Sequence, residues 1–255
     1  MHDIQNEVDT RGIVLDQVGI SGLRYPLTFE DGHFRQAGIA TIEVAVRLQH
    51  DRRGTHMSRM VALVHDHLQQ FDPRELPGVL KIGADLLEAP ALTVTISMPI
   101  STTVIAPASR AESLQVHDVR VEGRWDSGNT TVITSVTSDV TSLCPCSKAI
   151  SDYGAHNQRS RVTLAISGSG EFPYPLPVND AVGLLERCGS APVVPLVKRP
   201  DERVLTMQAY DEPVFVEDMA RGLSSICRDR GLSHTVSIRN LESIHSHDAI
   251  AQVAG

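Results

Sequence analysis

A change of hydrophobic period within GIATIEVAVRLQHDRRGTHMSRMVALVHDHLQQF, residues 38–71, indicates the fold class. From Ile42 to Leu48 apolar and polar residues alternate, which is typical of a half-buried strand. From Met57 to Phe71 apolar residues recur every three or four positions, which predicts an amphipathic helix. A strand followed by such a helix favours a sheet that carries its helices on one face.

The same two periods recur along the rest of the chain. They predict strands over 18–29, 92–98, 119–125, 129–141, 161–166, 233–240 and 248–254, and helices over 77–88, 178–188 and 215–229. The order strand-strand-helix-helix-strand-strand occurs twice. It predicts an α+β fold with two tandem ββααββ units, antiparallel sheets and helices on one face. We place the first unit, with an N-terminal extension, at 1–126 and the second at 127–255. On the pattern alone, a single irregular α+β domain is the alternative.

Composition excludes several classes of protein. Hydrophobic residues make up 41% of the 255 residues and charged residues 21%, which is typical of a folded globular chain. The net charge of −8 argues against a broad nucleic-acid-binding face, although a local group of lysines and arginines can still bind a small anion. No apolar run reaches the roughly 18 residues of a membrane helix, and the polar N-terminus does not resemble a signal peptide. We therefore expect a cytoplasmic protein with no membrane contact.

The four cysteines fall into two groups. Cys188 and Cys227 lie in apolar, helix-like stretches and are expected in the core. Cys144 and Cys146 flank Pro145 in a polar segment. In a chain of this length without a signal sequence, we do not expect a disulfide framework.

The segment SLCPCSKAISDYGAHNQRS, residues 142–160, carries most of the chemistry. It holds Cys144 and His156, and thiolate and imidazole are standard ligands of zinc and other divalent metals. Neighbouring cations favour the thiolate. Two or three protein ligands with room for water suit a catalytic metal site. The alternative is a buried cysteine and a turn histidine.

Acidic residues and histidines later in the chain are weaker candidates. Glu202 follows a run of charges, Glu217 lies in a predicted helix, and Glu242 precedes His245 and His247. Taken one by one, each is also explained as a solvated surface group.

The segment 142–160 resembles the type IB GTP cyclohydrolase I family. The resemblance extends in order along most of the chain, through DTRGIVLDQVGISGLRYPLTF (9–29), GTHMSRM (54–60), KRPDERVLTMQAYDEPVFVEDMAR (198–221) and NLESIHSHDA (240–249). It implies the tunnelling fold and a homotetramer with active sites at subunit interfaces. It also implies conversion of GTP and water to 7,8-dihydroneopterin triphosphate and formate, the first step toward tetrahydrofolate. The cofactor implied is a divalent metal, zinc or manganese, with iron as a further candidate.

The resemblance also implies roles for particular residues. Cys144, His156 and Glu202 match metal-site positions, and Cys144 and Glu202 also count as catalytic groups. His245 matches a site histidine that ligates the metal or transfers protons, although His247 is an alternative for that place. Cys146 receives no firm role. Ala149 and Met60 depart from the family pattern at positions outside this chemistry.

Substrate contacts follow from the same matched segments. Glu217 matches the glutamate that anchors the purine edge, where it would accept hydrogen bonds from guanine N1 and N2. The triphosphate requires cations, and the candidates are Lys148, Arg159, Lys198, Arg199 and Arg203.

Two other functions remain open from the sequence. The related nitrile reductase of queuosine synthesis uses NADPH, but the run from Glu242 to His247 has histidines in place of its lysine- and aromatic-bearing cofactor motif. A non-catalytic metal- or nucleotide-binding module is the second. The joint presence of Cys144, His156, Glu202 and Glu217 argues against it.

Overall fold

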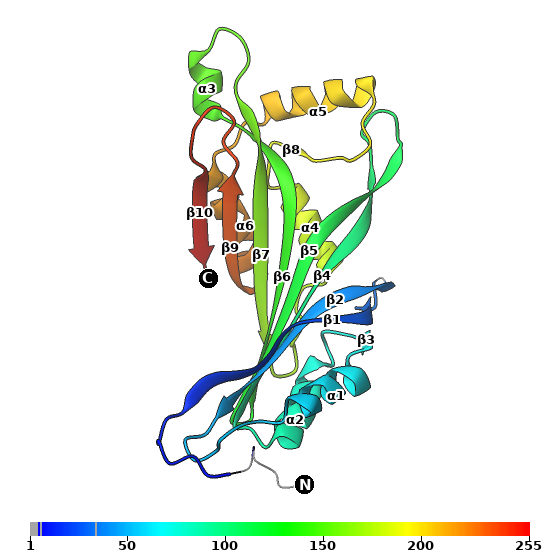
Figure 1. Cartoon of the computed structure of the whole chain (residues 1–255). Coiled ribbons are helices and arrows are strands. Elements are labelled where there is room, and N and C mark those ends of the chain that lie inside the picture. The colour runs from blue at the N-terminus through cyan, green and yellow to red at the C-terminus, as the bar shows by residue number, and fades with distance from the viewer. Residues whose placement is uncertain (1–4, 6, 34) are drawn as a thin grey trace. The chain divides into compact units, whose positions relative to one another are not determined.

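The computed structural model describes residue 5, residues 7–33 and residues 35–255. Strands and helices alternate along the chain (Figure 1), in the order β1 (Leu15–Glu30), β2 (Arg35–Leu48), α1 (Met57–His67), β3 (Gln70–Phe71), α2 (Leu76–Leu87), β4 (Ala91–Ile105), β5 (Glu112–Asp126), β6 (Asn129–Leu143), α3 (Pro145–Ile150), β7 (Asn157–Ser169), α4 (Val178–Glu186), β8 (Ala191–Pro192), α5 (Arg199–Asp211), α6 (Val216–Asp229), β9 (Ser233–Asn240) and β10 (Ala249–Ala254).

The strands hydrogen-bond in the order β10-β9-β7-β6-β5-β4-β2-β1-β3, and β8 pairs with β6. The pairing is mixed, because β1 runs antiparallel to β2 but parallel to β3. Residues pack into two compact units built from separated segments. Unit 1 comprises Met1–Met98, Arg120–Thr134 and Ser167–Pro175, and unit 2 comprises Pro99–Val119, Ser135–Ile166 and Leu176–Gly255.

In unit 1 the helices α1 and α2 pack together beneath the strands (Figure 1). The inward positions of β2, Ile42, Val44 and Val46, are fully or almost fully buried, as their alternation predicts. On β5, Gly123 permits a close approach by α2, because a Cβ at this position would lie 2.7 Å from the Leu76 side chain.

In unit 2 the helix α6 packs against β9 and β10. Its apolar face buries Val216, Met219 and Leu223. Cys227 also lies in this core, and burial raises the pKa of Cys188 to about 12. The prediction of a core position is confirmed for Cys227, whereas Cys188 is only partly buried.

A tight turn joins β5 to β6. Ser127 and Gly128 both have positive φ, 51° and 94°, as a type I′ hairpin turn requires. The sequence predicted a turn at this place.

The predicted fold class is wrong in its architecture. The ten strands of the described residues form one hydrogen-bonded sheet, not two tandem ββααββ units with antiparallel sheets and helices on one face. The second half of the chain also has α3, α5 and the short strand β8 between its longer elements. Local periodicity locates strands, but it does not specify which strands pair, and β4 to β7 each contribute to both units.

Two helices escaped the sequence patterns. The short α3 lies inside the cysteine segment, where only six residues are helical. The other helix is α5, which begins within the run of charges that precedes Glu202. Asp201 stabilises this start by accepting hydrogen bonds from the backbone N–H groups of Lys198, Ala108 and Ser109. None of the helices in the described part of the chain is long and apolar enough to cross a membrane.

Candidate functional site

The segment between β6 and β7 closes on itself and brings Cys144 beside His156. The Cys144 N–H donates to the His156 carbonyl at 3.0 Å. Ser147 links the two residues, since its N–H donates to Cys144 Sγ at 3.4 Å and its Oγ accepts from the His156 N–H at 3.3 Å. These bonds hold the backbones of Cys144 and His156 against each other.

The imidazole of His156 is held by Gln158. His156 Nδ1 lies 2.8 Å from Gln158 Oε1. A carbonyl oxygen only accepts hydrogen bonds, so Nδ1 carries the proton and Nε2 keeps its lone pair. Gln158 is only 7% exposed. This tautomer is the one needed for a histidine that ligates through Nε2.

Glu242 reaches the same place from the loop after β9. Its Oε2 lies 3.8 Å from His156 Nδ1, and both side chains are 10% exposed. This oxygen has no hydrogen-bond partner among the described residues. A buried carboxylate oxygen without a partner is costly, so the site is suited to a cation.

His245 completes the cluster. One potential ligand atom each from His156, Glu242 and His245 lie within 4.8 Å of one another. The His245 ring is edge-on to the His156 ring at 5.9 Å, and the His247 ring stacks on His245 at 5.3 Å. We call His156, Glu242 and His245 the acid–imidazole cluster. Cys144 lies beside it through its backbone bond to His156.

The other predicted acidic residues lie outside this cluster within one chain. Glu202 is exposed in the first turn of α5. Glu217 is exposed in the first turn of α6. Among the described residues, neither belongs to the group of potential ligands around His156.

The predicted phosphate-binding cations fall into two groups. Lys148 is engaged within the chain, because its ammonium donates to the Tyr210 carbonyl and lies 4.3 Å from the centre of the Tyr210 ring. Arg159 lies 3.8 Å from Asp139. Exposed cations occupy the start of α5, namely Lys198 as its N-cap residue, Arg199 and Arg203.

Sequence reasoning undervalued Glu242 and overlooked Gln158. Glu242 precedes His245 by three residues, a spacing that is compatible with a shared metal site, but alone it also fits a surface loop. Gln158 gave no local signal. Its role depends on the contact with His156, which only the folded chain shows.

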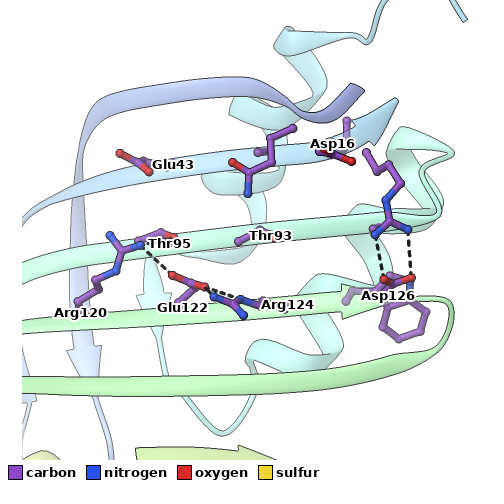
Figure 2. A pocket seen from close by; sticks show the side chains of 14 residues that line it. Asp16, Glu43, Thr93, Thr95, Arg120, Glu122, Arg124 and Asp126 are labelled. Carbon is purple, nitrogen blue, oxygen red and sulfur yellow. Dashed lines mark hydrogen bonds and ion pairs between the residues drawn. The ribbon is translucent and has the colours of Figure 1, made fainter. Parts of the chain in front are cut away.

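A larger hollow lies on the sheet of unit 1 (Figure 2). It encloses about 640 Å³ and is lined by residues of β1, β2, β4 and β5. Most of its charged side chains pair with one another: Arg120 and Arg124 both contact Glu122, and Arg47 pairs with Asp126. The geometry therefore points to the acid–imidazole cluster, not to this hollow, as the reactive site.

Comparison with known proteins gives the family. The family model described as type I GTP cyclohydrolase folE2 matches residues 1–251. The protein called GTP cyclohydrolase FolE2 from Herminiimonas arsenicoxydans is 38% identical, over 98% of this chain and 95% of its own. Its namesake from Neisseria gonorrhoeae is also 38% identical, over 99% of this chain and 97% of its own.

Among solved structures, uricase from Arthrobacter globiformis has a similar fold. The TM-score is 0.53 at 9% identity, over 95% of this chain and 94% of the uricase. At this identity the likeness concerns the fold alone. It agrees with the continuous strand order and supports the correction to the predicted architecture.

The family label drawn from the sequence also needs correction. The resemblance pointed to the type IB GTP cyclohydrolase I family, whereas the matching model and the relatives carry the folE2 description. The match covers nearly the whole chain, and the chain belongs to the type I GTP cyclohydrolase folE2 family.

Proposed function

We propose that this GTP cyclohydrolase carries out its reaction at the acid–imidazole cluster, with Cys144 beside it. The buried Oε2 of Glu242 supports this location best. It lies near the imidazoles of His156 and His245 and has no hydrogen-bond partner among the described residues. The reaction hydrolyses GTP to 7,8-dihydroneopterin triphosphate and formate, the first step of tetrahydrofolate synthesis.

The donor set fits a divalent metal ion. Thiolate, imidazole and carboxylate together suit zinc, manganese or iron, and an unpartnered buried carboxylate favours a bound cation. Cys144, His156 and Glu242 would hold it, and His245 would lie beside it to transfer protons. When bound, such an ion supplies Lewis acidity, which lowers the pKa of a water molecule to about 7.

The chain's own residues then position the reactants and move protons. Gln158 keeps the His156 Nε2 lone pair free. Water adds to C8 of the guanine, the imidazole ring opens, and hydrolysis of the resulting formamide releases formate. His245 would donate a proton to N7 as water adds to C8, because a positioned imidazolium can act as a general acid.

Substrate binding would use residues that the single chain leaves exposed. Glu217 would accept hydrogen bonds from guanine N1 and N2, which discriminates guanine from adenine. Lys198, Arg199 and Arg203 at the start of α5 would bind the triphosphate. Arg159 and Lys148 would assist, since an ammonium bonded to one carbonyl still has two donors.

A homotetramer with active sites at subunit interfaces would reconcile these positions. Glu202 and Glu217 are exposed within one chain, although the family resemblance places both at the site. A second copy that packs against the cluster would bring such residues to it and exclude water from the guanine edge.

The test is metal-dependent turnover. We would strip the protein of metal, add manganese or zinc back, and follow the product as fluorescent neopterin after oxidation. We expect metal-dependent turnover in the wild type, its loss in Cys144→Ala, and its retention in Cys188→Ala. The control removes a thiol that is also partly buried but lies outside the proposed site.

Two outcomes would contradict the proposal. If metal-free protein turned over GTP at the full rate, the metal assignment would fall. If Cys144→Ala kept wild-type turnover and metal affinity, the reaction would lie elsewhere.

A further inference from the structure

Three buried side chains form a directional chain of hydrogen bonds in unit 2. Ser160 Oγ donates to Asn240 Oδ1 at 2.6 Å, and Asn240 Nδ2 donates to Ser142 Oγ at 3.3 Å. Ser142 Oγ in turn donates to the Val214 carbonyl at 2.9 Å. Ser160, Asn240 and Ser142 are 0%, 3% and 1% exposed. These three hydrogen-bonded side chains are therefore shielded from solvent.

Each member of this chain lies close in sequence to a residue of the proposed site. Ser142 lies on β6, two residues before Cys144. Ser160 lies on β7, four residues after His156. Asn240 is the last residue of β9 and comes two positions before Glu242. Val214 lies just before α6, which carries Glu217.

Backbone bonds reinforce two of these connections. The Leu241 N–H donates to the Arg159 carbonyl at 2.9 Å, so the chain is still tied to β7 one residue before Glu242. The Val214 N–H donates to the Leu143 carbonyl at 3.1 Å. Four separated segments thus meet at one set of polar groups.

Asparagine is unusual at this position. Along β9 the inward residues are His234, Val236, Ile238 and then Asn240. A buried amide is costly unless it is fully hydrogen-bonded, and an apolar residue would continue the core without that cost. The carboxamide accepts from Ser160 through its oxygen and donates to Ser142 through its nitrogen at the same time.

We propose that Asn240 is a positioning residue, which sets the Glu242–His245 loop against the Cys144–His156 turn. The inference rests on the proposed function for its consequence in metal binding, but the positioning itself is measurable without metal. Asn240 touches none of the reacting groups and acts through the segments that it ties together.

The first test is amide hydrogen exchange in metal-free protein. Asn240→Ala should speed exchange at least severalfold in the peptides covering 241–248 and 143–156. The matched control is Ser224→Ala, which removes a buried hydroxyl bonded to His234 Nε2 at 2.8 Å, at the opposite end of β9. The control should lower the melting temperature but leave exchange in 241–248 unchanged.

The second test is metal affinity, measured by titration of zinc or manganese against a competing chelator. Loss of a group that orients ligands typically weakens metal binding by about 10- to 100-fold. We expect a loss of this size in Asn240→Ala and none in Ser224→Ala. If Asn240→Ala does not fold, Ser142→Ala provides a milder break, because it keeps the Ser160–Asn240 bond.

The two proposals fail in different ways. If the wild type does not bind one metal ion per site, the proposed metal site is wrong. The hydrogen-exchange experiment still decides the role of Asn240. If Asn240→Ala and Ser224→Ala give the same exchange pattern and the same metal affinity, Asn240 is only a core hydrogen-bonding group and the inference is wrong.

Discussion

The hollow of unit 1 and the acid–imidazole cluster of unit 2 differ in how their charges are balanced. In the hollow, Glu122 lies between Arg120 and Arg124, and their hydrogen bonds outweigh the effect of burial, so the pKa of Glu122 is lowered (Figure 2). In the cluster, Glu242 faces His156 and His245, with no guanidinium or ammonium paired to it in the described structure. The hollow of unit 1 is about 640 Å³ in volume and is lined by more charged side chains than the cluster contains.

The difference shows that unbalanced buried groups, not the size of a hollow, mark the place that needs a ligand. A carboxylate that is already neutralised gains little from a bound cation, whereas a buried one without a partner gains much. The predictions below test this contrast.

The largest effect should come from His245. His245→Ala should lower kcat by roughly 10²- to 10⁴-fold, the usual size of a general acid–base contribution. His247→Ala should have a much smaller effect, because its ring stacks on His245 and lies outside the acid–imidazole cluster. Turnover at saturating metal and GTP measures both. Equal losses in the two variants would leave the identity of the site histidine open and weaken the cluster as drawn.

The next effect concerns the two contrasted carboxylates. Glu242→Gln should weaken metal binding by at least about tenfold, because the substitution removes the charge beside His156. The matched variant Glu122→Gln should leave metal binding and turnover unchanged. It should cost about 1 kcal/mol of stability or less, since it breaks only surface ion pairs. Equal metal affinities in the two variants would contradict the contrast.

A third carboxylate is buried but fully satisfied, and it should affect stability alone. Hydrogen bonds from Ser109, and then from the backbone of Lys198 and Ala108, hold the pKa of Asp201 well below its usual value. The ionised group therefore stabilises the folded chain above the unfolded pKa, near 3.8, and this contribution is lost as the pH falls toward the folded pKa.

Asp201→Asn should accordingly melt several degrees lower than the wild type at pH 7. The gap should narrow as the pH falls below about 4. Metal affinity per folded chain should not change. A gap that widened in acid would contradict the assigned sign.

The sequence located most elements correctly but not their assembly. The alternation of β2 and the start of α1 lie where they were predicted, because both depend on which face of a local element is buried. The predicted helix ran too far, since α1 ends at His67 and Phe71 lies in β3. The prediction of two tandem ββααββ units was wrong, because it required strand pairings that depend on contacts far apart in the sequence. The division at residues 126 and 127 and the homotetramer remain predictions.

The candidate site divides along the same line. The sequence alone determined that Cys144 and His156 lie together, because they flank one short segment between two strands. The family label that those motifs suggested needed correction, because the matching family model and the relatives carry the folE2 description. Only the tertiary structure decided that Glu242 and Gln158 are the neighbours of His156. The physical reason is that β7 and β9 are adjacent in the sheet, and that the buried Asn240 ties their ends together.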